Sequence, residues 1–254
     1  MSCRSIVIAL PLIACSATAA PIDEPTADAN EQATPDSSSA ACSGKSAQPV
    51  NATWRVDGRD VEVHVPASYD PTLRAPIVLN IHGLSSSGAD QAELTHMIES
   101  SNAHGFIAVH PNGTGSPRGW NGGDCCNPAA ASNVDDAAFI AKVIDEVEAT
   151  LCADADRIYA IGMSNGAFLA NRLACELADR IAAIGAVSGV LGIDACTPSR
   201  PVPVFHVHGT SDFVVPFGGG GVNGNISVED SIAGWATRNH CTAAPVTTHD
   251  EGDA

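Results

Sequence analysis

The sequence predicts an α/β fold with helices on both faces of a mostly parallel central sheet. Short apolar runs, typical of buried parallel strands, alternate with helical segments along the chain. Hydrophobic residues make up 44% of the 254 residues, which is enough for a sizeable core. Three loops that carry candidate functional residues each follow a predicted strand, at the edge of the sheet where ligands of parallel sheets bind.

The predicted strands begin with a hairpin. Two segments of alternating character flank Asp57-Gly58, a dipeptide that favours a tight turn. The later strands are continuous apolar runs, as expected when both faces of a strand are covered. In chain order the predicted strands are Asn51–Val56, Val61–Val65, Ala75–Asn80, Phe106–His110, Ile158–Ile161, Ile181–Val187 and Val202–Val207.

Four segments are predicted to be helices. In one of them Phe139, Val143 and Val147 recur every four residues, which places them on one helical face. The predicted helices are Ala89–Ser101, Asn133–Leu151, Asn165–Leu177 and Glu229–Asn239. A long loop, Pro111–Ala131, precedes the second helix, and loops of this length in compact domains are usually functional.

Residues 1–20 are predicted to be an export signal, because a weakly basic start precedes an apolar run too short to span a bilayer. Two cleavage sites remain open. Ala17-Thr18-Ala19 resembles an ordinary signal-peptidase site. Leu12-Ile13-Ala14-Cys15 resembles the bacterial lipoprotein box, in which the signal ends at Ala14 and a lipid on Cys15 tethers the protein to the envelope.

A flexible linker is predicted over 21–48, because this polar, proline-containing stretch cannot bury a core. The folded domain is expected over 49–254. The formal net charge of −17 disfavours nucleic acid or an anionic membrane surface as a partner. Nine cysteines are present, and discounting Cys3 and Cys15 leaves seven, an odd number; export favours disulfides for most of them.

The stretch Gly162-Met163-Ser164-Asn165-Gly166 is a G-x-S-x-G motif between a predicted strand and a predicted helix. A serine on such a turn has its hydroxyl exposed above the sheet edge, as a nucleophile requires. The Asn165 N–H opens the helix and can stabilise an oxyanion. The alternative interpretation is a serine in an ordinary helix N-cap loop.

Two further loops supply the other groups that a serine nucleophile needs. Asp212 follows the last predicted strand and is the candidate carboxylate that orients a base. Leu84, after His82-Gly83, is the candidate for the second oxyanion N–H. The alternatives are a turn-forming aspartate and a plain turn at a strand end.

His206 and His208 alternate onto one face of the last predicted strand. With Asp212 they raise the question of a zinc site, because histidines at this spacing do bind zinc. The strand is apolar and no third ligand is evident, so buried histidines with satisfied hydrogen bonds are the favoured interpretation. No metal and no cofactor are predicted.

The ordered segments IHGLSSSG, GWNGGDCC, NVDDAAFI, GMSNGAFLANRLAC and VPVFHVHGTSDFVVP resemble exported esterases of the polyhydroxybutyrate depolymerase and feruloyl esterase group. The resemblance covers roughly Asn51 to Cys241. It implies an α/β-hydrolase fold and a Ser-Asp-His serine esterase. It assigns Ser164 as nucleophile, Asp212 as acid, Leu84 and Asn165 as oxyanion donors, and Trp120 to the substrate pocket.

The sequence departs from the family pattern at its carboxyl end. The family's Gly-His-x-Trp-Pro segment, which carries the triad histidine, is absent, and after Asp212 only His240 and His249 remain. The chain is therefore expected to stop before the last strand and helix, with a partner for Cys241 further on. Cys175 and Cys196 are the favoured disulfide pair.

The expected function is hydrolysis of a carboxylic ester, either of a short-chain polyester or of a feruloyl or acetyl polysaccharide. The protein is expected outside the cell or lipid-anchored at the envelope. The alternatives are a non-catalytic surface or binding protein that lacks the triad histidine, and another serine hydrolase such as a peptidase. The oligomeric state stays open.

Overall fold

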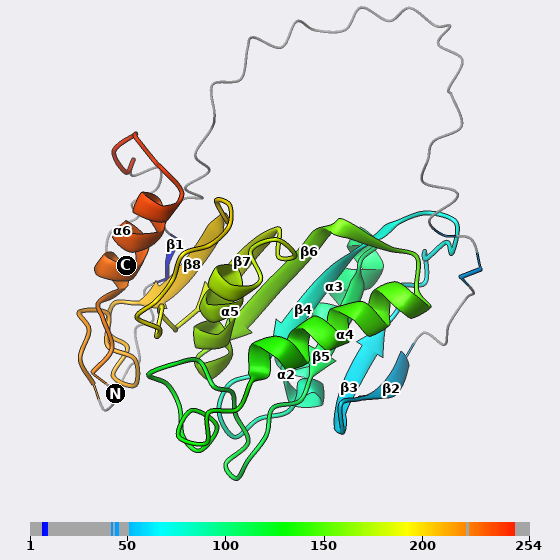
Figure 1. Ribbon diagram of the computed structural model, residues 1–254, viewed down its shortest axis with the longest axis horizontal. Coiled ribbons are helices and arrows are strands. Elements are labelled where there is room, and N and C mark those ends of the chain that lie inside the picture. Colours follow the sequence, from blue (N-terminus) through cyan, green and yellow to red (C-terminus); the bar gives the residue numbers. More distant parts are fainter. Residues whose placement is uncertain (1–6, 10–41, 43, 46–50, 222–223, 247–254) are drawn as a thin grey trace, which may run out of the picture.

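The computed structural model describes residues 7–9, 42, 44–45, 51–221 and 224–246. Its centre is an eight-stranded sheet in the order β1-β8-β7-β6-β4-β5-β3-β2 (Figure 1). The strands are β1 (Val7–Ala9), β2 (Asn51–Val56), β3 (Arg59–His64), β4 (Ala75–Ile81), β5 (Ile107–Pro111), β6 (Ala153–Met163), β7 (Ala183–Val187) and β8 (Val204–Gly209). Strands β4 to β8 pair in parallel, whereas the pairs β2–β3, β3–β5 and β1–β8 are antiparallel.

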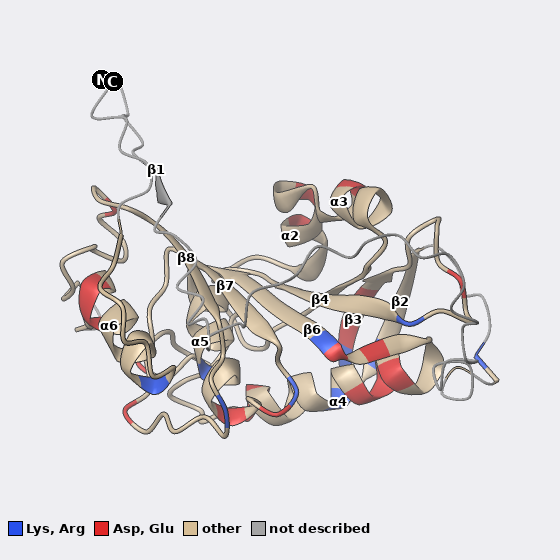
Figure 2. Cartoon of the chain, turned by 90° about the horizontal axis from the view of Figure 1, so that it is seen from above, with Lys and Arg blue, Asp and Glu red and all other residues tan. Residues whose placement is uncertain are grey.

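Helices cover both faces of the sheet, as the sequence predicts. The helices are α2 (Gly88–Thr95), α3 (Met97–His104), α4 (Asp136–Thr150), α5 (Asn165–Glu176) and α6 (Val228–Arg238). Figure 2 shows α2 and α3 on one side of the sheet and α4 and α5 on the other. Strand β4 serves both sides, because Leu79 belongs to the main core with Phe139 of α4, whereas Val78 packs with Met97 of α3.

The predicted helix Ala89–Ser101 is two helices. The break falls at His96, which has a left-handed backbone with φ 49° and ψ 36°. The N–H of His96 donates to Ala92 O and Glu93 O, which closes α2. Glycine and asparagine commonly take this conformation, so a histidine there gave no signal for a helix end.

The structure describes two parts of the amino-terminal region, Val7–Ala9 and the segment around Cys42. Val7–Ala9, inside the predicted export signal, forms the edge strand β1 against β8. The possible cleavage sites and Cys15 lie outside the described residues, as do most of the linker and His249. No helix in the described part of the chain is long and apolar enough to cross a bilayer.

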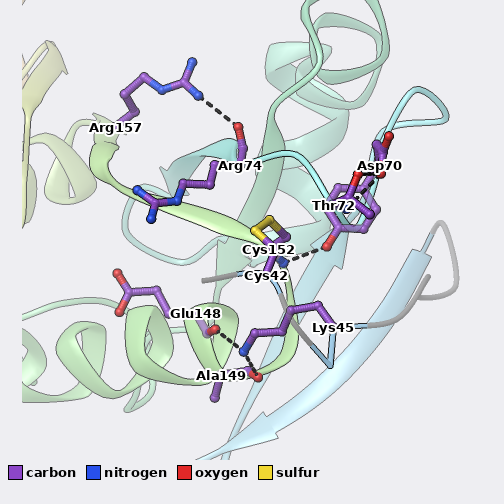
Figure 3. Close-up of a disulfide and its surroundings, with 10 residues drawn as sticks. Cys42, Lys45, Asp70, Thr72, Arg74, Glu148, Ala149, Cys152 and Arg157 are labelled. Carbon is purple, nitrogen blue, oxygen red and sulfur yellow. Dashed lines mark hydrogen bonds between the residues drawn. A yellow bond between two sulfur atoms is a disulfide. The ribbon is translucent and has the colours of Figure 1, made fainter. Parts of the chain in front are cut away.

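The end of the predicted linker is attached to the domain. Cys42 forms a disulfide with Cys152, immediately before β6 (Figure 3). The Lys45 ammonium donates to the carbonyl oxygens of Glu148, at 2.8 Å, and of Ala149, at the carboxyl end of α4. A cation in this position satisfies carbonyls that α4 itself leaves unbonded. The attached part of the chain therefore starts before residue 49.

Two more disulfides lie within the domain. Cys175 and Cys196 are joined, which confirms the pair favoured from the sequence. The neighbours Cys125 and Cys126 are joined to each other. Cys241 is disulfide-bonded as well, so the odd count, which discounted Cys3 and Cys15, does not leave it without a partner.

Candidate active site

Ser164 lies at the turn between β6 and α5. Its backbone has φ 52° and ψ −122°, a conformation that is strained for a residue with a side chain. Its N–H donates to Val187 O at 2.8 Å, and its carbonyl accepts from the N–H groups of Ala167 and Phe168. These bonds to β7 and to the first turn of α5 hold the strained turn in place. This is the strand-to-helix geometry that the motif predicts.

The two glycines of the motif are required by close packing. A Cβ atom on Gly162 would lie 2.2 Å from Gly166 O, and one on Gly166 would lie 2.3 Å from Ile81 O. Both obstacles are backbone atoms, which cannot move aside as the end of a side chain can. The Ser164 side chain forms no hydrogen bond that caps α5, so the alternative of an ordinary N-cap loop does not describe this turn.

The turn at Gly83-Leu84 lies directly against the serine. A Cβ atom on Gly83 would be 3.6 Å from Ser164 Cβ. The turn is fastened by the Ser85 N–H, which donates to Arg118 O at 2.7 Å. Among the described residues, the N–H groups of Leu84 and Asn165 form no hydrogen bond. The two predicted oxyanion donors are therefore both unpaired, as that role requires.

His82 fixes the loop that carries Leu84. Its Nε2 accepts from the Gly113 N–H at 3.0 Å, so its Nδ1 carries the proton and donates to Gly83 O at 2.7 Å. Burial lowers the pKa of this imidazole, which keeps it neutral. With both ring nitrogens bonded, His82 is a structural histidine and not a base for Ser164.

Trp120 and Asn165 connect this loop to the helix behind the serine. The Asn165 side chain accepts from the Trp120 N–H at 2.7 Å and donates to Trp120 O at 2.9 Å. The Trp120 indole N–H donates to His82 O at 2.9 Å. Both side chains are fully buried. The family resemblance assigns Trp120 to the substrate pocket, whereas in the structure its indole is fully buried in the core, and its N–H bonds to the loop that carries Leu84.

Asp136 is a supporting residue that sequence reasoning missed. It is fully buried, and its carboxylate pairs with Arg59 at 2.5 Å and accepts from the Asn121 N–H at 2.7 Å. The Arg59 guanidinium also lies 4.0 Å from the centre of the Phe139 ring. The available signal was the Asp135-Asp136 pair, because one aspartate is enough to cap a helix and the second is left for another task.

Asp212 lies in the loop after β8, with its carboxylate held in one orientation. Its Oδ1 accepts from the N–H groups of Val214 and Val215, both at 2.9 Å. Its Oδ2 is 3.5 Å from His208 Nε2 and the side chain is 16% exposed. Because β4, β6 and β8 run parallel, their carboxyl ends lie at one edge of the sheet. Leu84, Ser164 and Asp212 all follow strands at that edge.

His206 and His208 form a buried pair on β8. His208 Nε2 donates to Val215 O at 2.7 Å, so its Nδ1 accepts from His206 Nε2 at 3.1 Å. Burial lowers the pKa of His206 to about 4. The structure thus confirms core histidines with satisfied hydrogen bonds. No cluster of three or more potential metal ligands is present in the described part of the chain.

No histidine in the described residues contacts the Ser164 hydroxyl. The buried histidines are all bonded elsewhere, and His240 is exposed just beyond α6 with φ 56°. His249 lies outside the described residues. The position of the triad base therefore stays a prediction.

The fold and this turn define an α/β-hydrolase, and a crystal structure described as a thermostable esterase shares the fold. That structure has a TM-score of 0.53 and 17% identity, over 74% of this chain and 52% of its own. The family model "Esterase PHB depolymerase" matches residues 63–217, well over half of the chain. The chain belongs to this polyhydroxybutyrate depolymerase esterase family.

Curated relatives point to the same group. Feruloyl esterase B of Piromyces equi is 32% identical over 201 residues, which cover 74% of this chain and 37% of that protein. The bifunctional acetylxylan esterase/xylanase XynS20E of Neocallimastix patriciarum is 29% identical over 160 residues, covering 63% of this chain and 22% of its own. A probable feruloyl esterase C of Aspergillus niger is 28% identical over 183 residues, which cover 70% of this chain and 63% of that protein. The chain thus spans less than two thirds of the length of these relatives.

Proposed function

We propose that this protein is an exported serine esterase that hydrolyses carboxylic esters through an acyl-enzyme on Ser164. The conformation of Ser164 is the observation that carries the proposal. A φ of 52° on a non-glycine residue, held between two sterically required glycines, is costly to maintain. Such strain is common where a side chain must be presented for chemistry.

In the proposed mechanism Ser164 attacks the ester carbonyl, and the N–H groups of Leu84 and Asn165 stabilise the oxyanion. A histidine removes the serine proton and later gives it to the leaving alcohol, and Asp212 orients that histidine through Oδ2, the carboxylate oxygen that accepts no backbone N–H. Water then releases the acid. Because no histidine in the described residues contacts the Ser164 hydroxyl, the base is proposed to come from a histidine outside the described residues.

The substrate class is proposed from the relatives. Their names include feruloyl esterase and acetylxylan esterase, which favours acyl groups linked to plant-wall polysaccharide. The family model's own name keeps a short-chain polyester in consideration. Export, with or without a lipid on Cys15, agrees with a polymeric substrate that cannot enter the cell. No metal or cofactor takes part.

A fluorophosphonate probe tests the nucleophile. The protein produced from its own gene is treated with the probe, digested and examined by mass spectrometry. We expect the adduct on Ser164 and none in a Ser164→Ala variant. Ser188→Ala is the matched control, because Ser188 also follows a strand and has φ 52°, and this variant keeps the adduct. Failure to label a folded protein at Ser164 would contradict the proposal.

A non-catalytic binding protein is the second candidate. The observation that favours it is the engagement of all buried histidines in other contacts. This candidate predicts a ligand that binds without turnover and an unlabelled Ser164. Replacing His249 separates the sources of the base, because a loss of esterase activity in His249→Ala identifies it and unchanged activity assigns the role to another histidine.

A further inference from the structure

An open, mainly polar pocket of about 450 Å³ lies beside the loop that carries Leu84. It is formed by the β2–β3 hairpin, the start of α2 and the loop after β5. Because β3 runs antiparallel to β5, the start of β3 lies at the edge of the sheet where β4, β5 and β6 end. The pocket and Ser164 therefore share one edge of the sheet. The volume of the pocket is typical of sites for small ligands.

Two hydrogen bonds join the wall of this pocket to the loop that carries Leu84. Arg118 O accepts from the Ser85 N–H at 2.7 Å, and the Gly113 N–H donates to His82 Nε2 at 3.0 Å. Arg118 and Gly113 line the pocket, whereas His82 and Ser85 lie on either side of Leu84 in the sequence. The pocket is therefore next to the place where a substrate of Ser164 would bind.

The Arg118 guanidinium is a charge without an acidic partner. Its side chain is exposed, and in the described part of the chain it donates only to Asn112 Oδ1, at 3.2 Å, and forms no ion pair. The other two arginines of the pocket each have a carboxylate partner. These ion pairs are Arg55–Asp60 and Arg59–Asp136. Most N–H donors of Arg118 therefore remain for a ligand.

Asn112 holds this guanidinium in place. The Asn112 side chain is buried, and its Oδ1 accepts from the Gly88 N–H at 3.0 Å as well as from Arg118. Its Nδ2 donates to Asp60 O and to Glu62 Oε2, both at 3.0 Å. Because both ends of the amide are bonded, its orientation is fixed. A guanidinium held in this way loses less conformational freedom when a ligand binds.

The charged groups of the pocket select the ligand. A guanidinium pairs best with a carboxylate, because the two oxygens match two of its N–H groups. Asp60 and Glu62 line the same pocket, so a hydroxyl donor is favoured near them and a multiply charged anion is repelled. A hexuronate meets both requirements, since it carries one carboxylate and several hydroxyl groups. A neutral sugar leaves Arg118 without an acidic partner.

We propose that Arg118 binds the carboxylate of a hexuronate on the polysaccharide that carries the scissile ester. The inference rests on the proposed function, because it treats the pocket as a part of the substrate site. Arg118 is then a specificity-determining residue: it contacts a substituent of the substrate and none of the reacting atoms. The protein is expected to prefer esters that lie close to an acidic sugar.

Calorimetric titration of the whole protein tests the site with two oligosaccharides, xylotriose and xylotriose that carries one glucuronosyl branch. Neither carries an ester, so their binding is independent of whether Ser164 is a nucleophile. We expect the acidic oligosaccharide to bind about tenfold more tightly, as for one charge-assisted hydrogen-bonded pair. Equal affinities, or no binding of either oligosaccharide, would overturn the proposal.

Variants of Arg118 test the guanidinium itself. Arg118→Gln removes the charge, and Arg118→Lys retains the charge but not the planar fork of donors. The preference for the acidic oligosaccharide is expected to disappear in the first variant and to decrease in the second. Arg74→Gln is the matched control, because Arg74 is also exposed and forms no ion pair among the described residues, but precedes β4 at the opposite edge of the sheet. An equal loss in this control would contradict a specific site.

Kinetics separate this inference from the proposed function. In Arg118→Gln we expect fluorophosphonate to label Ser164 at the parent rate, because the probe carries no hexuronate. For an acetyl ester of the acidic oligosaccharide we expect a KM about tenfold higher with an unchanged kcat, and for acetylated xylotriose no change. A parent protein that prefers the acidic oligosaccharide but is not labelled would refute the serine mechanism and retain the Arg118 site. A preference that survives in Arg118→Gln would refute the site alone.

Discussion

At the scale of single residues, adding one methyl group beside Ser164 tests how tightly this turn is packed. Gly166→Ala places a Cβ atom 2.3 Å from a backbone oxygen. We expect a loss of about 1–3 kcal/mol in the free energy of unfolding and at least a tenfold slower reaction of Ser164 with fluorophosphonate. Gly218→Ala is the control, since a Cβ atom there meets nothing within 4 Å. Equal effects in both variants would show that the turn accommodates an added methyl group at residue 166 without a steric clash.

The buried His206 makes stability depend on pH. Its pKa is about 4 in the folded protein and near 6.5 when unfolded, so the unfolded chain binds more protons between these values. Stability is therefore complete above about pH 6.5 and falls as the pH drops toward 4. His206→Gln keeps a donor for His208 but does not titrate. Urea unfolding should show that this variant loses about 2 kcal/mol less than the parent between pH 7 and pH 5.

At the scale of elements, Trp120 connects α5 to the loop after β4, and a single substitution can remove one hydrogen bond of this connection. Trp120→Phe removes the N–H that donates to His82 O. We expect labelling of Ser164 to slow about tenfold, because the Leu84 N–H loses its support. Trp235→Phe is the matched control: this buried indole donates to Asn171 from α6. Stability should fall by about 1–3 kcal/mol in both variants, but labelling should slow only in the first.

The elements themselves were largely predictable, and their contacts were not. Period and turn signals located every strand from β2 to β8 and the helices α4 to α6, with ends shifted by a few residues. The break at His96 was missed because no glycine or proline marks it. The two hydrogen bonds of the Asn165 side chain to the Trp120 backbone join residues 45 positions apart, and no local sequence pattern encodes such a contact. The same holds for Asp136 with Arg59.

At the scale of the whole molecule, two disulfides close loops of very different length. Cys42 and Cys152 are 110 positions apart, and Cys175 and Cys196 are 21 apart. Loop entropy predicts that the longer link stabilises more, by about 1–2 kcal/mol. Calorimetry of the two double-alanine variants checks this, each compared with the parent. A larger loss on removing the shorter link would show that packing around Cys175 outweighs chain entropy.

The Cys42–Cys152 link also sets the path of mechanical load. Cys152 precedes the amino end of β6, and Ser164 follows its carboxyl end. A pull applied to the chain directly before Cys42 passes through the sulfur atoms into the start of β6. The hairpin β2–β3, next along the backbone, is bypassed. Load applied at this point enters the domain at the amino end of β6, whereas Ser164 follows its carboxyl end. The length of β6 therefore separates this point of load from the turn that presents Ser164.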